Sequence, residues 1–187
     1  MIWIIVVLAV VIILLAVWLV ALYNRLIRLR VEVQTGWANI DVQLRRRYDL
    51  IPNLIEAVKG YVAHEKGVLE AVTEARTSAM SASGPAEAGT ANGALASALG
   101  GLFVVAENYP DLKASSNFLQ LQSELAIVEE SLAASRRYYN ATVGRYNATQ
   151  ATAPTVFIAR FGDFGLAEFF EEDDQAVRSA PQVSFDQ

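Results

Sequence analysis

The chain opens with an uninterrupted run of apolar residues. Residues 2–22 contain no charged side chain, and Trp3, Trp18 and Tyr23 lie near the two ends of the run. A helix of this length spans roughly 32 Å, enough to cross a hydrocarbon core of about 30 Å, and aromatic rings prefer the membrane interfaces. Residues 1–23 are therefore predicted to form a transmembrane helix that anchors the protein in membrane lipid.

A cleaved signal peptide is the alternative to a retained anchor. Signal peptides usually begin with basic residues, have a shorter apolar segment and end in a small-x-small cleavage site. Here no Lys or Arg precedes the apolar run, so the retained anchor is favoured. Because Arg25, Arg28 and Arg30 follow the run at once, the positive-inside rule predicts an outside N-terminus and a cytoplasmic location for residues 24–187.

Beyond the anchor, apolar residues recur in steps of three or four, which places them on one face of a helix. Four such stripes are present: Leu26, Leu29, Val33, Trp37, Ile40 and Leu44; Ile55, Val58, Val62, Leu69 and Val72; Leu95, Leu99, Leu102 and Val105; and Phe118, Leu121, Leu125, Val128, Leu132, Ser135, Tyr139, Thr142 and Tyr146. The last stripe alternates strictly between the two steps, as in a heptad seam. No sustained strand pattern occurs. The predicted fold is all-α, with an antiparallel four-helix up-and-down bundle over residues 24–153.

Helix breakers separate the stripes. The segment SAMSASGPAEAGTANG, residues 78–93, is rich in Ser, Ala and Gly and predicts a mobile loop. Asn108 and Pro110 are expected to end the third helix, and Ser115 or Ser116 can cap the fourth.

The stretch RRRYDLIPNL, residues 45–54, separates the first two stripes. A proline in a helix interior costs about 3 kcal/mol but is tolerated in the first turn, where Asp49 could act as the cap of a helix containing Pro52. We therefore expect one helix to end near Arg47 and the next to begin near Leu50. A single long kinked helix is the alternative, because the apolar spacing nearly continues through the stretch.

Composition excludes several classes of function. The chain has no cysteine, and His64 is its one histidine, so disulfides, thiol catalysis and histidine clusters within the chain are excluded. The formal net charge of -5 arises in the C-terminal segment, from Glu168, Glu171, Glu172, Asp173 and Asp174. The remainder is neutral overall, so nucleic-acid binding is not expected.

No constellation of catalytic residues stands out. Glu124, Glu129 and Glu130 could suggest a carboxylate metal site, but di-iron bundles require paired Glu-x-x-His motifs and His64 cannot supply two. The glycine motifs that bind phosphate and the Gly-x-Ser-x-Gly motif of hydrolases do not occur. We expect a protein that is not an enzyme, with no metal and no cofactor.

One candidate interaction site is the end of the bundle farthest from the membrane. Residues 45–47 lie roughly 33 Å along the helix from the membrane surface, several Debye lengths of about 8 Å, which is too far for a lipid-binding patch. Cations also stabilise a helix C-terminus, and this is the simpler explanation of the arginines. The alternative is a partner-docking surface, here called the tip surface, formed by Arg45, Arg46, Arg47, Asp49, Tyr109 and Lys113.

The second candidate is the aromatic and acidic C-terminal tail, residues 154–187. It contains Phe157, Phe161, Phe164, Phe169 and Phe170, and disordered segments are usually poor in aromatic residues. These side chains either close the membrane-proximal end of the bundle core, or form an interfacial foot or a contact between copies of the chain.

Long stretches of the sequence resemble the LemA family of bacterial membrane proteins. They are WANIDVQLRRRYDLIPNLIEAVKGYVAHEKGVLEAVTEAR (37–76), ENYPDLKASSNFLQLQSELAIVEE (107–130), YYNATVGRYN (138–147), FIARFGDFGLAEFF (157–170) and PQVSFD (181–186). The departures are Tyr48, where the family pattern has His, and Ser184, where it has Asp. The resemblance implies one span in the bacterial inner membrane, an outside N-terminus, a cytoplasmic four-helix bundle and a hairpin rather than a kink at Pro52.

The resemblance implies no enzyme chemistry, and a branch of the family is associated with building magnetosome membranes. We therefore expect a membrane-anchored scaffold that self-associates and organises a membrane patch or an envelope protein complex. The alternative is a monomeric or low-order adaptor that recruits a membrane protease, a transporter or a stress-response partner through the tip surface.

Overall fold

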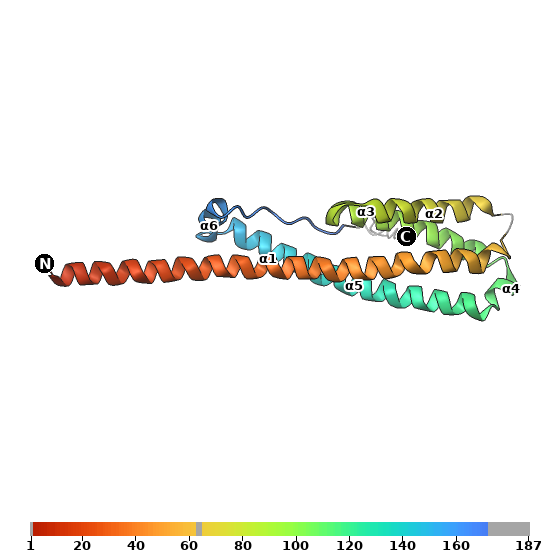
Figure 1. Cartoon of the computed structure of the whole chain (residues 1–187), viewed down its shortest axis with the longest axis horizontal. Coiled ribbons are helices and arrows are strands. Elements are labelled where there is room, and N and C mark those ends of the chain that lie inside the picture. Colours follow the sequence, from red (N-terminus) through yellow and green to blue (C-terminus); the bar gives the residue numbers. More distant parts are fainter. Residues whose placement is uncertain (1, 63–64, 172–187) are drawn as a thin grey trace, which may run out of the picture. The chain divides into compact units, whose positions relative to one another are not determined.

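The computed structural model describes residues 2–62 and 65–171, and every regular element within them is a helix (Figure 1). The all-α class is therefore confirmed. The helices are α1 (Ile2–Lys59), α2 (Lys66–Ser81), α3 (Gly84–Ala106), α4 (Pro110–Lys113), α5 (Ser116–Ala151) and α6 (Thr155–Phe161).

The chain divides into two compact units. Unit 1 comprises Met1–Val42 and Leu132–Phe169, and unit 2 comprises Gln43–Ser131 and Phe170–Gln187. The helices α1 and α5 contribute residues to both units, whereas α2, α3 and α4 belong to unit 2 and α6 belongs to unit 1.

The expected helix end near Arg47 is wrong, because α1 continues through Pro52 to Lys59. Pro52 itself is exposed, so its ring lies on the outer face of the helix. On the inner face, a stripe of buried side chains runs without a break through the Pro52 region: Ile40, Leu44, Ile51, Leu54 and Val58. Burial of a large aliphatic side chain contributes about 1.5–3 kcal/mol, so this stripe outweighs the cost of about 3 kcal/mol for one proline.

Pro52 also leaves one helical carbonyl without its usual donor. In an α-helix the N–H of each residue bonds to the carbonyl four positions earlier, and proline has no N–H. The carbonyl in question is that of Tyr48, and it accepts a hydrogen bond from Arg76 Nε of α2 at 2.8 Å. A side chain from a neighbouring helix therefore replaces the missing backbone donor.

The mobile loop expected over residues 78–93 is also wrong. Only Ala82 and Ser83 separate α2 from α3, and α3 begins at Gly84, whose φ of 81° lies in the left-handed region that favours glycine. Alanine has the highest helix propensity, and burial of Ala79, Ala88, Gly89 and Asn92 adds packing to that preference. The segment is therefore helical despite its serines and glycines.

The helices of unit 2 share a core built from the predicted stripes. The helices α2 and α3 pack against each other and run in opposite directions (Figure 1). Ala106 ends α3 just before the predicted breaker, and Ser116 begins α5. The antiparallel arrangement of all four long helical segments stays a prediction.

The long seam predicted for α5 is confirmed as a buried face. Ser135 is half-buried, and all the other predicted members are buried: Phe118, Leu121, Leu125, Val128, Leu132, Tyr139, Thr142 and Tyr146. The members from Phe118 to Val128 belong to unit 2, and those from Leu132 to Tyr146 belong to unit 1.

The N-terminal part of α1 presents apolar side chains to its surroundings on every side. Residues 2–20 are all exposed in the structure, which suits a helix surrounded by lipid. By length and composition α3 could also cross a membrane, but a third of its most apolar stretch is buried in the protein. The first helix is therefore the candidate membrane anchor, and α3 is a core helix of unit 2.

Candidate interaction sites

The tip surface is not at a helix end. Arg45, Arg46 and Asp49 are exposed residues in the interior of α1, which continues to Lys59, roughly 15 Å beyond Asp49. Tyr109 is half-buried between α3 and α4, and Lys113 is exposed in the last turn of α4. The part of unit 2 that carries α4 is the end at which α1 stops (Figure 1), so the longer helix separates Asp49 from the residues expected beside it.

Arg47 is buried and is not available as a partner contact, contrary to the prediction. Its guanidinium donates to Asn92 Oδ1 at 2.9 Å and pairs with Glu129 at 3.1 Å, which links α1, α3 and α5 within unit 2. Burial lowers the pKa of Arg47 from its usual value, and the Glu129 carboxylate acts in the opposite direction. Arg47 is thus a polar member of the core.

The spacing of apolar residues in the sequence indicates a core position for Arg47. Leu44, Arg47, Ile51 and Leu54 follow one another in steps of four and three, so Arg47 occupies a core position of a continuous stripe. The prediction missed it because the stripe was divided at the expected helix end.

After α6 the C-terminal tail turns at Gly162 and Asp163 and then runs without regular secondary structure; residues 162–169 are here called the strap. Side chains of α5 hold its backbone within unit 1. Asn147 binds Ala167 twice, accepting its N–H and donating to its carbonyl, both at 2.9 Å. Gln150 donates to the carbonyl of Gly165 at 3.2 Å, and the Tyr139 hydroxyl donates to the carbonyl of Glu168 at 2.7 Å.

The Tyr139 hydroxyl is held in its neutral form at physiological pH. Burial raises its pKa to about 12, and the Glu168 carboxylate acts in the same direction. Burial also raises the pKa of Tyr146, although Arg30 and a hydrogen bond with Gln150 oppose that shift. Both tyrosines are therefore structural hydrogen-bonding groups in unit 1.

The residues that hold the strap were not predicted from the sequence. Asn147 and Gln150 lie three residues apart beside Tyr146, at the end of the heptad seam of α5. Two amide side chains on the continuation of an apolar stripe are a usable signal for a polar partner on that face.

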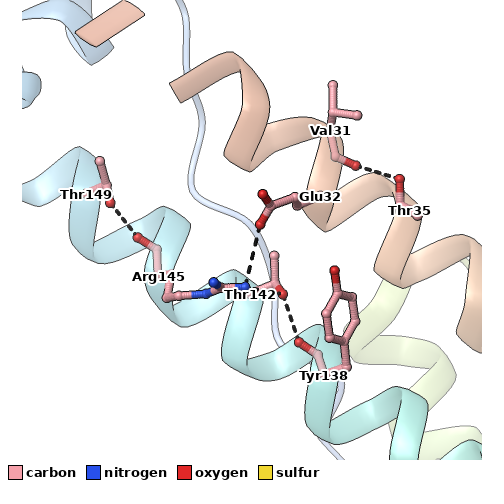
Figure 2. Close-up of polar contacts among 7 residues, drawn as sticks. All are labelled: Val31, Glu32, Thr35, Tyr138, Thr142, Arg145 and Thr149. Atoms are coloured by element: carbon pink, nitrogen blue, oxygen red, sulfur yellow. Dashed lines mark hydrogen bonds and ion pairs between the residues drawn. The ribbon is translucent and has the colours of Figure 1, made fainter. Parts of the chain in front are cut away.

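A further link in unit 1 joins α1 to α5. Figure 2 shows Glu32 of α1 paired with Arg145 of α5 at 3.5 Å. Arg145 also donates to Thr142 Oγ1 at 3.2 Å, and that hydroxyl donates to the Tyr138 carbonyl at 2.9 Å. Both charged side chains of the pair are about half exposed, so the pair contributes at most about 1 kcal/mol.

The five tail phenylalanines divide into two groups. Phe164 and Phe170 are buried, and the Phe164 ring packs edge-on against Tyr23 with 5.7 Å between ring centroids. Phe157, Phe161 and Phe169 are 61%, 94% and 40% exposed. Burial of Phe164 and Phe170 fits a role in the core, whereas an external contact through Phe157, Phe161 and Phe169 stays a prediction.

An apolar groove of about 540 Å³ lies between the two helices of unit 1 that meet here. One wall is the end of the apolar run of α1, with Leu19, Val20 and Tyr23; the other is α6 and the residue after it, with Phe157, Ile158, Phe161 and Gly162. Apart from the Tyr23 hydroxyl the lining side chains are apolar, so the groove can accept an apolar chain.

Some of the predictions concern residues outside the described ranges. His64, the acids from Glu172 to Asp174 and the closing PQVSFD segment with Ser184 all lie there. Within residues 2–62 and 65–171, no three His, Asp or Glu side chains lie close enough to hold a metal ion together.

Comparison with known proteins agrees with the family resemblance of the sequence motifs. The sequence model of the LemA family matches residues 36–185. The chain is 24% identical over 176 residues to magnetosome protein MamQ 2 of Paramagnetospirillum magneticum, covering 80% of this chain and 65% of that protein. It is 26% identical over 155 residues to protein LemA of Metamycoplasma hominis, covering 81% of this chain and 69% of that protein. The chain thus matches less than two thirds of the length of the MamQ relative.

Proposed function

Because this chain belongs to the LemA family, a group that includes membrane-associated helical proteins, we propose that it is a membrane-anchored scaffold without enzymatic activity. Copies of the chain self-associate and organise a patch of membrane or a protein complex in it. The relatives named magnetosome proteins support a membrane-organising role. We place the protein in the bacterial inner membrane, with the N-terminus outside and both units in the cytoplasm.

One observation carries this proposal: α1 contains the candidate membrane anchor and also contributes core residues to both units. The helix runs without interruption from the apolar residues 2–22 to Lys59. Leu26 and Ile40 are core positions of unit 1, and Leu44 and Leu54 are core positions of unit 2. A contact between copies in either unit is therefore coupled to the bilayer through one continuous helix.

Exposed aliphatic side chains on α5 offer a contact between copies. Leu119 and Ile127 lie eight residues apart, about two turns, and are 49% and 51% exposed in unit 2. Single exposed aliphatic residues are common on protein surfaces, but two on one helix face can form a self-complementary contact.

The decisive experiment is the mass of the full-length protein in mild detergent or lipid nanodiscs, measured by mass photometry. A discrete assembly that Leu119→Lys with Ile127→Lys breaks up, while Val104→Lys on α3 leaves it intact, would support the proposal. Val104 is 65% exposed and is a matched control for the added charge. Single 20.4 kDa copies of the unmodified chain would refute self-association.

A second candidate is an adaptor that recruits a membrane protease, a transporter or a stress-response protein. A small groove of about 170 Å³ in unit 2 favours it, because Lys113 lies at this groove together with Phe103 and Glu107. Photocrosslinking from position 107 at the same groove would capture a specific partner, and Lys113→Glu in that chain would abolish the capture. Arg46→Glu, which reverses an exposed charge, tests whether the exposed arginines of α1 contribute to the same contact.

The orientation can be tested because the chain has no cysteine. A cysteine introduced at Arg46 should react in intact cells only with a membrane-permeant maleimide. Reaction with an impermeant reagent would reverse the proposed topology.

A further inference from the structure

We propose that α6 is a second membrane contact. Phe157 and Phe161 insert into the interfacial region of the bilayer, and the groove between α6 and α1 holds an acyl chain of an anionic phospholipid. This inference rests on the membrane anchoring proposed above, and does not depend on self-association.

The burial pattern of α6 shows that two of its aromatic side chains are exposed. Thr155 and Ala159 are buried in unit 1, whereas Phe157 and Phe161 are 61% and 94% exposed. The two phenylalanines are four residues apart, so they lie on the same side of the helix. A nearly fully exposed phenylalanine is unfavourable in water, and a pair on one face is typical of a helix that lies at a lipid surface.

The position of the groove identifies lipid as its occupant. Leu19 and Val20 belong to the apolar run that crosses the bilayer, and Tyr23 marks its end. When α1 spans the membrane, this wall of the groove lies where hydrocarbon meets the headgroups. The opposite wall, formed by Phe157 and Phe161, is then at the same level, so the groove is continuous with the acyl-chain region.

The charges nearby favour an anionic headgroup. Arg160 lies in the last turn of α6, and Arg25, Arg28 and Arg30 follow the apolar run of α1; all four are exposed. Asp163 is an exposed acid on the strap. Glu32, two residues after Arg30, is paired with Arg145. These four guanidinium groups outnumber the two carboxylates and match the phosphate of an anionic lipid, which arginine binds through paired hydrogen bonds.

The test uses the full chain with a single introduced cysteine. Phe161→Cys is labelled with an environment-sensitive fluorophore, and the protein is placed in nanodiscs that contain a lipid with a nitroxide in its upper acyl chain. Val104→Cys, on the exposed face of α3 in unit 2, is the matched control. We expect strong quenching at position 161 and none at position 104, and the same pattern for Phe157→Cys.

Two outcomes would overturn the proposal. The first is a probe at position 161 that is reached by a water-soluble quencher and not by the nitroxide lipid. The second is a probe shielded from both quenchers, with the shielding lost when each disc holds a single copy of the protein, which would assign α6 to a contact between copies. Mass photometry on the same discs reports self-association separately, so failure of the two proposals can be told apart.

The headgroup preference has its own readout. Replacing part of the phosphatidylcholine by phosphatidylglycerol should raise the quenching at position 161. Arg160→Glu should reduce the preference for the anionic lipid about fivefold or more, the effect of roughly one basic residue near an anionic surface. Arg46→Glu in unit 2 should leave it unchanged. Equal quenching in both lipid mixtures would remove the anionic headgroup from the proposal.

Discussion

Arg76 Nε lies 2.8 Å from the backbone carbonyl oxygen of Tyr48, the carbonyl that Pro52 leaves without a helical donor. The two residues are on different helices of unit 2, so this hydrogen bond joins the interior of α1 to α2 at the position where a proline would otherwise weaken the helix. It explains how α1 passes through residues 48–52 without ending there.

The first prediction is that the effects of Arg76 and Pro52 on stability are coupled. Arg76→Met should lower the free energy of unfolding by about 1–3 kcal/mol, since it leaves a carbonyl of α1 without a donor. In a Pro52→Ala background the restored N–H of residue 52 binds that carbonyl, so the same change should cost less than about 1 kcal/mol. The measurement is a double-mutant cycle from denaturant unfolding followed by circular dichroism. An equal cost in both backgrounds would contradict this explanation, and Arg46→Met serves as the exposed control.

The second prediction concerns the buried polar link between Arg47 and Asn92. Arg47→Met should cost about 1–3 kcal/mol, because it removes the guanidinium from the buried Asn92 amide. Replacing both groups, with Arg47→Met and Asn92→Leu, should cost less than the sum of the two single changes, since neither partner of this link is then left buried without the other. Glu129→Gln should cost less than about 1 kcal/mol, as the Glu129 side chain is 48% exposed. A double variant that loses the full sum of the two single losses would be inconsistent with this pairing.

The third prediction is a loss of stability at high pH that depends on Tyr139. The pKa of its hydroxyl is about 12 in the folded protein and about 10 in an unfolded chain. The folded state therefore retains a proton that the unfolded state loses, so the contribution of Tyr139 is complete below about pH 10 and falls as the pH rises towards 12. Tyr139→Phe should reduce this loss of stability at high pH. It should also cost about 0.5–1.5 kcal/mol at neutral pH, because the bond to the strap is lost.

Denaturant unfolding at a series of pH values measures both effects, with tyrosine absorbance reporting the ionisation directly. Tyr138→Phe is the matched control, because Tyr138 is 47% exposed. If the two variants have the same pH profile, Tyr139 is not the group responsible.

The fourth prediction compares two glycines of α3. A Cβ at Gly89 would overlap the backbone of Glu171, whereas a Cβ at Gly100 would meet no other atom. Gly100→Ala should therefore stabilise the protein by about 0.5–1 kcal/mol through its helix propensity. Gly89→Ala should destabilise it by about 1–3 kcal/mol, since the chain at Glu171 must move away. Thermal unfolding of the two variants beside the unmodified chain provides the comparison; stabilisation by both would show that the close approach at Gly89 has no energetic consequence.

The sequence predicted those parts of the fold that depend on local pattern. The strict spacing from Phe118 to Tyr146 identified the buried face of α5, because a heptad seam leaves little choice of which side faces inward. Continuation of α1 through Pro52 could not be predicted from local pattern. The donor that replaces the missing N–H belongs to Arg76, which is distant in the sequence. The segment of residues 78–93 was misjudged because its alanines favour a helix as strongly as its glycines and serines favour a loop.

In the candidate sites, too, local pattern predicted some features, whereas others depend on contacts between distant parts of the sequence. The aromatic content of the tail was visible in the sequence, but its separation into buried Phe164 and exposed Phe161 depends on where α6 and the strap pack. Arg47 was assigned to the surface by its charge, although the spacing of Leu44 and Ile51 already placed it in a core stripe.

The strap is held through its backbone, and this has a consequence for how the chain can vary. Asn147, Gln150 and Tyr139 bind carbonyl and N–H groups that every residue except proline possesses. Among the side chains of the strap, Leu166 is 74% exposed and takes no part in those bonds. Relatives of this protein can therefore change the outward residues of the strap to suit different surroundings while its path along α5 is preserved.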